Sequence, residues 1–249
     1  MPTRKSLHRR RRTKRHRRFA RKRQSGGANA TEIHTTIHPP TEINDLITHV
    51  IYINLDKRTD RRAEMEAELS IFTPEKVTRL PGILGEKEGI APAVACTKGH
   101  IEALKLARKN NYSNVLILED DVVWVNTDES FPIFKGILQN TYDGIMLGAT
   151  FVDYDKNTYL LKQGYTASSY LVHQNHYDKM IDYLEKRINE YDPAVVKTKN
   201  EAQAFAPNVI MVANRTDDKW FIVSPSLMVQ RPSFSNVAKI EVNYRSVFV

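Results

Sequence analysis

The stretch NVLILEDDVVW, residues 114–124, decides the fold. It begins with the continuous apolar run that is typical of a strand buried on both faces, as in a parallel sheet covered by helices. Three acids follow in a row, Glu119, Asp120 and Asp121, which we call the acid triplet, and apolar residues resume at once with Val122. Because unpaired charge is costly to hold between apolar segments, the acid triplet indicates a bound cation or another polar partner.

The segments around this strand alternate between strand and helix patterns. Residues 49–55 (HVIYINL) and 142–148 (YDGIMLG) have the composition of buried strands. Residues 56–72, with Asp60 as the expected cap, and residues 96–111 carry apolar side chains at helical spacing. Further patterns predict a short strand in 76–83, a hairpin and strand in 158–172, a helix in 175–191 and a strand in 217–230 that turns at Pro225. The alternation predicts a Rossmann-like α/β domain, a mostly parallel sheet flanked by helices, whose ligands bind beyond the carboxyl ends of the strands.

Charge divides the chain into a basic arm and an acidic body. Residues 4–23 contain 13 of the 37 Lys and Arg and no acid, which leaves 24 basic residues against 29 Asp and Glu elsewhere. Because residues 1–30 contain few large apolar residues, we expect them to form a disordered arm. Residues 31–48 are then a linker, and residues 49–249 the folded domain. Residues 4–23 are suited to contact with nucleic acid, polyphosphate or an anionic membrane. The alternative is a solubilising extension that takes no part in the chemistry.

Several functional classes are disfavoured by what the sequence lacks. Its one cysteine, Cys96, excludes an intramolecular disulfide framework and an all-cysteine metal site, and fits a reducing compartment. No apolar run is long enough to cross a bilayer and none follows the N-terminal charges, so we expect no anchor or secretory signal and a cytoplasmic location, with an arm compatible with nuclear import. The motifs GxxxxGK[ST] and GxGxxG are missing, which disfavours P-loop kinases and dinucleotide oxidoreductases.

The acid triplet has the chemistry of a hard-metal site. Clustered carboxylates raise one another's pKa unless a cation lies between them. Mg²⁺ and Mn²⁺ take one or two protein carboxylates and complete their shell with water and substrate phosphates. Because side chains alternate along an extended segment, Asp121 and Glu119 are expected to contact the ion, and Asp120 to hold the ribose or a metal-bound water. The alternative is a solvated strand end whose acids cap a helix or pair with arginines.

Five short motifs, in order, resemble glycosyltransferase family 25. They are YINLDKRTDRR (52–62), ACTKGH (95–100), LILEDDV (116–122), DGIMLG (143–148) and SPSLMVQRPSFSNV (224–237), so the resemblance covers roughly residues 49–237. The family includes lipooligosaccharide galactosyltransferases and collagen hydroxylysine galactosyltransferases. The resemblance implies a GT-A fold, a UDP-sugar donor, usually UDP-galactose, and a Mn²⁺ or Mg²⁺ ion. It further implies transfer of a hexose with inversion to a hydroxyl acceptor, such as a glycan or hydroxylysine.

The resemblance also implies donor-site roles for residues outside the acid triplet. These residues are Asn54, Leu55, Asp56, Arg58, Arg61, Lys98, His100, Trp220 and Gln230. The first three are expected at the uracil and ribose, the two arginines at the diphosphate, Lys98 and His100 near the donor phosphates, and the last two in a pocket wall. The alternatives are a solvated helix face for the arginines, preferred for Arg62, a structural hydrogen bond for His100 and a core position for Trp220.

Inversion also requires a general base. The candidates are Asp192, Glu201, Asp217 and Asp218, and we choose Asp218, just before KWFIVSP. His173 and His176 are interpreted as an exposed helix start rather than a metal pair.

The sequence departs from the family pattern at two places. Gly99 replaces the family's serine, and SNV at 235–237 puts Asn236 where the family has an acid. These departures leave open a change of acceptor, reduced activity, or a degenerate module that binds sugar nucleotides or polyanions without transfer. The basic arm keeps a further alternative open, a metal-dependent nuclease.

Overall fold

The structure is a computed structural model that describes residues 38–207, 217–235, 240–242 and 248. The basic arm (1–30) and Asn236 lie outside these residues. The chain divides into two compact units, residues 1–34 and 35–249, and the described residues all belong to the second.

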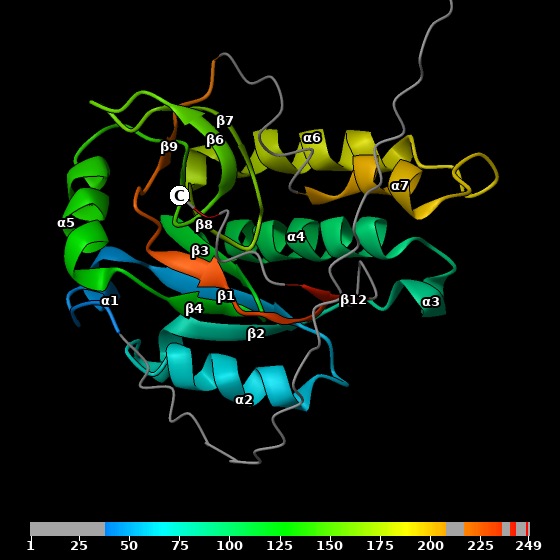
Figure 1. Cartoon of the computed structure of the whole chain (residues 1–249), viewed down its shortest axis with the longest axis horizontal. Coiled ribbons are helices and arrows are strands. Elements are labelled where there is room, and N and C mark those ends of the chain that lie inside the picture. The colour runs from blue at the N-terminus through cyan, green and yellow to red at the C-terminus, as the bar shows by residue number, and fades with distance from the viewer. Residues whose placement is uncertain (1–37, 208–216, 236–239, 243–247, 249) are drawn as a thin grey trace, which may run out of the picture. The chain divides into compact units, whose positions relative to one another are not determined.

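A six-stranded sheet forms the centre of this unit, with the strand order β2-β1-β3-β8-β5-β9 (Figure 1). Its strands are β1 (His49–Asn54), β2 (Val77–Pro81), β3 (Asn114–Glu119), β5 (Gly144–Met146), β8 (Ser169–His173) and β9 (Trp220–Ile222). β1 pairs in parallel with β2 and β3, and β5 with β9, whereas β8 is antiparallel to both of its neighbours. The predicted mostly parallel α/β sheet is therefore confirmed.

Two helix layers cover the sheet, one on each face (Figure 1). The α-helices are α1 (Ile43–Leu46), α2 (Thr59–Glu68), α3 (Gly85–Glu88), α4 (Pro92–Lys109), α5 (Thr127–Leu138), α6 (Tyr177–Asn189) and α7 (Lys199–Ala202), and the 3₁₀ helices are η1 (Pro74–Lys76), η2 (Gln174–His176) and η3 (Gln203–Phe205). Side chains of α4 and α6 share one hydrophobic cluster with the sheet, and side chains of α2 and α5 share the other. Among the described helices, none combines the length and the apolarity that a membrane span requires.

Among the described residues, three antiparallel pairs of strands lie outside the central sheet. They are β4 (Val122–Trp124) with β10 (Met228–Gln230), β6 (Thr150–Tyr154) with β7 (Leu161–Tyr165), and β11 (Ser233–Ser235) with β12 (Ile240–Val242). The first pair matters most for the site. β4 begins directly after the acid triplet, and β10 returns a distant part of the chain to the same place.

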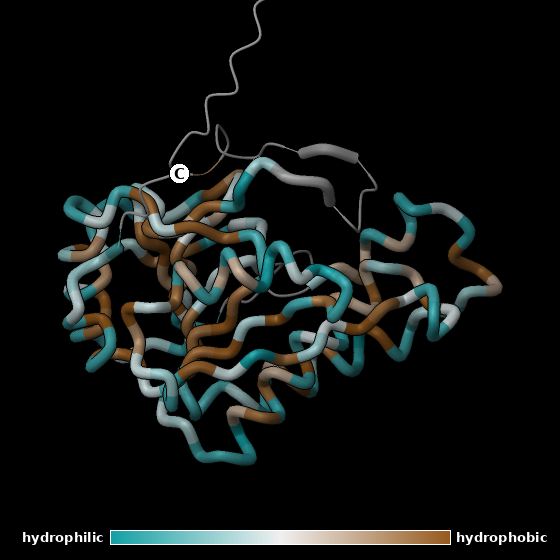
Figure 2. Tube along the Cα trace, turned by 90° about the horizontal axis from the view of Figure 1, so that it is seen from below, coloured by the Kyte–Doolittle hydropathy of each residue, from teal (hydrophilic) through white to brown (hydrophobic). Residues whose placement is uncertain are grey.

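The apolar patterns explain the central elements. Val115, Leu116, Ile117 and Leu118 of β3 are all fully buried, as expected for a strand covered on both faces. Figure 2 shows the same arrangement, with hydrophobic residues along the inner strands and hydrophilic residues along the outer turns. The helix predicted from residue 96 begins four residues earlier, at Pro92, because proline at the first helical position has no amide to leave unpaired.

Two expected boundaries differ from the observed ones. α2 begins at Thr59, so Asp60 is not its cap; it lies in the first turn, where a carboxylate is favoured by the helix dipole, and pairs with Arg58. Ile43 and Ile47, within the range assigned to the linker, are fully buried in the cluster that also contains Met65. The packed core thus includes residues before position 49.

Candidate functional site

The acid triplet lies where parallel strands end. Glu119 is the last residue of β3, and Asp120 and Asp121 form the turn into β4. Because β1 runs parallel to β3, its last residue, Asn54, reaches the same side of the sheet. We call this side, where β1, β2 and β3 end, the carboxyl edge. We call the opposite side, where β3, β5 and β9 begin, the amino edge.

Asp120 is held by side chains from β1 and α2. Asn54 Nδ2 donates to Asp120 Oδ2 over 2.7 Å, and Arg61 Nη1 donates to Asp120 Oδ1 over 2.6 Å. The Arg61 guanidinium also lies 3.1 Å from Asp121 Oδ2 and is buried with both acids. Arg61 therefore compensates carboxylates from inside the protein and does not present its guanidinium to solvent.

Glu119 and Asp121 share a different partner. Gln230 Nε2 lies 3.3 Å from Asp121 Oδ1 and 3.5 Å from Glu119 Oε2, close enough to donate to either. β10 brings this amide into place through its pairing with β4, and the next amide, of Arg231, donates to the Asp121 carbonyl over 2.6 Å. Asp120 thus faces β1 and α2, whereas Glu119 and Asp121 both face Gln230.

The electrostatics of the acid triplet favour a cation. Burial raises the pKa of Asp121 to about 7, with a further increase from Glu119 and an opposing effect of Arg61. The three carboxylates have one buried guanidinium among them. Hard carboxylate oxygens with an excess of negative charge fit a divalent metal ion.

α4 adds two side chains to Glu119. His100 is fully buried, with Nε2 3.4 Å from Glu119 Oε1, and its Nδ1 is hydrogen-bonded to the Tyr170 hydroxyl at 2.8 Å. The Cys96 thiol donates to the same Oε1 over 3.7 Å. Cys96 was not predicted as a site residue, although its spacing of four residues from His100 on a helix would have shown that the two share a face.

Lys98 does not join this group. Its ammonium pairs with Glu88 at 3.2 Å, and it lines a pocket of about 490 Å³ between α4 and α6. Lys98 is two residues from both Cys96 and His100, and residues two apart on a helix do not share a face, so Lys98 lies on another side of α4.

The residues after β1 are engaged in ion pairs. Arg58 pairs with Asp60 at 2.7 Å, and this hydrogen bond raises the pKa of Arg58. The exposed Asp56, which follows Leu55, pairs with Arg79 at 2.5 Å. Arg79 of β2, which was not predicted, also donates from Nε to Asn54 Oδ1 over 2.9 Å and so holds the amide that binds Asp120.

The alternative for Arg62 is confirmed. Its side chain is about half exposed and pairs with Glu66 on the outer face of α2, 2.8 Å away. It is therefore a solvated helix residue.

Asp218 lies at the amino edge, which corrects its prediction as the general base. β8 is antiparallel to β3 and β5, and β9 is parallel to β5, so the residues just before β5 and β9 lie at the same edge of the sheet as the start of β3. The length of β3, about 17 Å at roughly 3.3 Å per residue, separates this edge from the carboxyl edge. There the Asp218 carboxylate is buried and pairs with Lys179 of α6. A base at that edge cannot reach a hydroxyl beside the acid triplet.

Trp220 is a core residue rather than part of a pocket wall at the triplet. It is 5% exposed, at the start of β9, and packs against Tyr170 and His176.

The remaining candidate bases have local roles or positions. Asp192 accepts a hydrogen bond from the Ala194 amide, Glu201 completes a capping box with Thr198, and Asp217 is exposed next to Asp218.

His176 corrects the interpretation of residues 173–176 as an exposed helix start. It is 2% exposed and lies between two acids, with Nδ1 3.8 Å from Asp143 and Nε2 3.5 Å from Asp218. The carboxylates face different ring nitrogens, which fits an imidazole held between two acids better than one metal ion. No local sequence motif predicts this group, because Asp143, His176 and Asp218 are far apart in the sequence.

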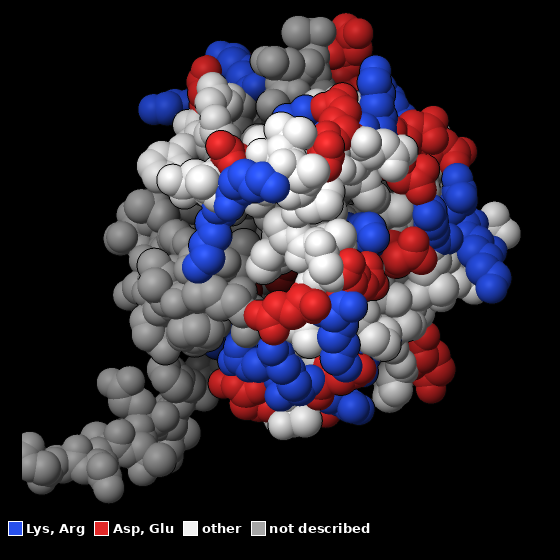
Figure 3. All heavy atoms as spheres, turned by 90° about the vertical axis from the view of Figure 1, so that its right-hand side faces the viewer, with Lys and Arg blue, Asp and Glu red and all other residues white. Residues whose placement is uncertain are grey.

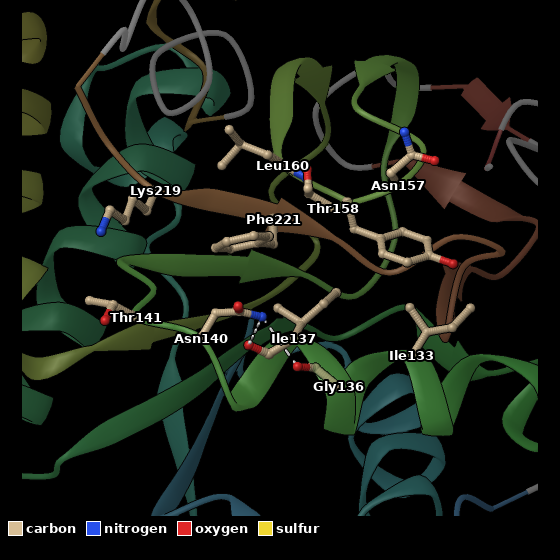
Figure 4. A pocket seen from close by; sticks show the side chains of 11 residues that line it. Ile133, Gly136, Ile137, Asn140, Thr141, Asn157, Thr158, Leu160, Lys219 and Phe221 are labelled. Atoms are coloured by element: carbon tan, nitrogen blue, oxygen red, sulfur yellow. Dashed lines mark hydrogen bonds between the residues drawn. The ribbon is translucent and has the colours of Figure 1, made fainter.

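One pocket and one face of the surface can be compared with the acid triplet. A pocket of about 650 Å³ lies between α5, the turn before β7, and β9 (Figure 4), and none of the predicted site residues lines it. Its Asn140 side chain is bound to the carbonyl groups of Gly136 and Ile137. On the face shown in Figure 3, basic and acidic side chains are intermixed. The predicted polyanion contact falls on residues 4–23, outside the described residues.

Comparisons with known proteins give similarity at the level of structure. The sequence matches no family model and no curated protein. The chain is similar to the crystal structure of a glycosyltransferase involved in the glycosylation of the major capsid of PBCV-1, with 14% identity, a TM-score of 0.44, and coverage of 77% of this chain and 95% of that chain. It is also similar to a mannose-1-phosphate geranyltransferase from Thermus thermophilus, with 9% identity, a TM-score of 0.40, and coverage of 70% of this chain and 72% of that chain. Both TM-scores are below 0.5. Membership of family 25 stays a prediction.

Proposed function

We propose that this chain is a metal-dependent glycosyltransferase that moves a hexose from a UDP-sugar to a hydroxyl acceptor with inversion. The observation that supports the proposal is the acid triplet at the carboxyl edge, in which Asp120 and Asp121 are buried and share the Arg61 guanidinium, while Glu119 is only partly buried and has no guanidinium contact among those observed. The motifs shared with family 25 favour galactose as the sugar.

The metal role belongs to Asp121 and Glu119. Both face Gln230, and burial, with a further effect of Glu119, raises the pKa of Asp121, an effect that a bound cation would oppose. A bound Mn²⁺ or Mg²⁺ ion would supply Lewis-acid stabilisation of the diphosphate leaving group. Asp120, bound by Arg61 and Asn54, would orient the turn that carries the other two acids.

The donor would lie over the end of β1 and the start of α2. Asn54, Leu55 and Asp56 keep their proposed place at the uracil and ribose. Because Arg61 is buried against two acids, Arg58 is the better candidate for the diphosphate: it is partly exposed, and its present partner Asp60 is a solvent-facing carboxylate that a phosphate would replace. The base that inversion requires would have to come from the carboxyl edge.

A donor panel tests the proposal. The chain is incubated with Mn²⁺ and each of several UDP-sugars, UDP release is measured without acceptor, and an acceptor screen follows with the preferred donor. We expect slow hydrolysis of one UDP-hexose that Asp121→Ala abolishes. The matched control is Asp218→Asn, which alters a buried acid at the opposite edge and should keep the activity.

Two outcomes would replace the proposal. If no UDP-sugar with Mn²⁺ shifts the thermal unfolding of the chain or releases UDP, the chain is not this transferase, and a polyanion-binding module is the better interpretation. If the chain instead cleaves DNA or RNA with Mg²⁺ and Asp121→Ala loses that cleavage, it is a nuclease.

A further inference from the structure

Three side chains of different chemistry converge at the inner side of Glu119. Cys96 and His100 come from the same face of α4, and Glu119 comes from the end of β3. One possible ligand atom from each, the thiol sulfur, an imidazole nitrogen and a carboxylate oxygen, lie within 4.8 Å of one another. This group is separate from the contacts that Glu119 makes with Gln230, since Oε1 faces α4 and Oε2 faces β10.

The separations match a tetrahedral metal. Zinc bond lengths of about 2.0–2.1 Å to nitrogen, about 2.0–2.2 Å to oxygen and about 2.3 Å to sulfur, at tetrahedral angles, place a nitrogen and an oxygen about 3.4 Å apart and a sulfur and an oxygen about 3.6 Å apart. The observed distances are 3.4 Å from His100 Nε2 to Glu119 Oε1 and 3.7 Å from Cys96 Sγ to the same oxygen. The third pair, the Cys96 sulfur and the His100 nitrogen, lies within 4.8 Å, so the three atoms surround a space of the size that one ion needs.

His100 provides the independent sign of a ligand. Its ring is fully buried, yet Nε2 makes no hydrogen bond, which is costly for a polar atom without water. The other nitrogen, Nδ1, is hydrogen-bonded to the Tyr170 hydroxyl. A histidine that ligates a metal through one nitrogen commonly donates the other N–H to an oxygen, which fixes the tautomer and aims the ring.

We propose that Cys96, His100 and Glu119 bind a Zn²⁺ ion. The donor set is thiolate, imidazole and one carboxylate, which suits zinc and not Mg²⁺ or Mn²⁺. Three protein ligands leave a fourth position open for water or another ligand. Binding releases the thiol proton of Cys96 to solvent, so each ion bound frees a proton.

This site would act on the acid triplet through Glu119. One carboxylate oxygen would bind Zn²⁺ while the other stays on the side of Gln230 and Asp121. Two dications that share a carboxylate repel each other, so Zn²⁺ should weaken Mn²⁺ binding at the acid triplet. The zinc site itself does not rest on the proposed transfer reaction.

Cobalt provides the test, without any nucleotide. Co²⁺ is added to the metal-free full chain, and absorbance in the near ultraviolet is followed for the thiolate-to-cobalt charge-transfer band. Because Cys96 is the one cysteine in the sequence, such a band reports on this site alone. We expect a band that saturates at one Co²⁺ per chain and is displaced by Zn²⁺, and that is lost in Cys96→Ser.

Further variants sharpen the result. His100→Gln should weaken Co²⁺ binding at least ~10-fold, whereas Asp121→Asn and Asp143→Asn should keep the band. If His100→Gln does not fold by far-ultraviolet circular dichroism, Cys96→Ser, at a partly exposed position, decides alone. A folded wild-type chain without the band, or Zn²⁺ binding by Cys96→Ser that equals wild type, would overturn the proposal. Neither result depends on UDP-sugar binding, so this proposal and the transferase proposal fail separately.

Discussion

Neighbouring carboxylates in the acid triplet differ in what compensates their charge. Asp120 accepts short hydrogen bonds from Arg61 and Asn54, at 2.6 and 2.7 Å. Asp121 receives a neutral amide from Gln230 at 3.3 Å, and the Arg61 Nη1 atom that binds Asp120 lies 3.1 Å from its Oδ2. Charge-assisted hydrogen bonds are roughly twice as strong as neutral ones. Of these two buried acids, Asp121 therefore has more to gain from a cation.

The raised pKa of Asp121 predicts a pH-dependent stability. Without metal, the folded chain keeps a proton between the ordinary value of 3.8 and about 7 that the unfolded chain has lost. This group therefore stabilises the fold at low pH, and the stabilisation is lost as the pH rises through about 7. We expect urea unfolding in the presence of a chelator to show a loss of up to about 1.4 kcal/mol per pH unit in that window, and Asp121→Asn to show a smaller slope. Equal slopes would refute the assignment.

Among the residues of α2, we predict that Arg61 contributes most to the free energy of unfolding. Arg61→Met leaves Asp120 and Asp121 buried without their cation, which should lower the free energy of unfolding by about 3–5 kcal/mol. Arg62→Met, on the exposed face of the same helix, is the control and should leave it nearly unchanged. Chemical denaturation of both variants measures the difference. Similar values would mean that Arg61 does not compensate the acids.

At the scale of elements, the pairing of β5 with β9 depends on a close approach. The ring of Trp220 crosses Gly144, and a Cβ at that position would lie 2.5 Å from the ring. Gly136, in α5, has nothing within 4 Å of a Cβ. The first glycine is required by packing and the second is not.

This difference predicts opposite effects of one substitution. Gly144→Ala forces β5 and β9 apart and should destabilise the fold by about 1–3 kcal/mol. Gly136→Ala removes backbone freedom from a helix interior and should stabilise it by about 0.5–1 kcal/mol. Thermal unfolding of the two variants against wild type gives the comparison. A Gly144→Ala variant as stable as wild type would contradict the packing described for Trp220.

The sequence predicted the helices and strands better than it predicted the edge of the sheet at which a given residue lies. Periodicity and apolar runs indicated β1, β3, α4 and α6 because those signals are local. The place of Asp218 depends on the direction of β8, which pairs antiparallel with strands far away in sequence and so puts Asp218 at the amino edge. The meeting of Asn54 and Asp120 was easier to expect, since parallel neighbours end together.

At the scale of the whole molecule, the basic arm and the acid triplet belong to different units of the chain. Basic residues concentrate in residues 4–23, and the acid triplet lies in the unit of residues 35–249. Deleting residues 1–30 should therefore leave donor hydrolysis unchanged, while binding to immobilised heparin should fall and lose its salt dependence. UDP release and salt elution measure the two effects. Loss of hydrolysis on deletion would show that the arm is part of the catalytic unit.

The most direct test of the central claim is Mn²⁺ binding at the carboxyl edge, measured by electron paramagnetic resonance of free Mn²⁺ with UDP present. We predict that the wild-type chain binds Mn²⁺ more tightly with UDP than without it. Asp121→Ala should weaken binding by at least ~100-fold, and Asp218→Asn, at the amino edge, should bind as wild type does. Wild-type affinity in Asp121→Ala together with loss of binding in Asp218→Asn would contradict the assignment of the site.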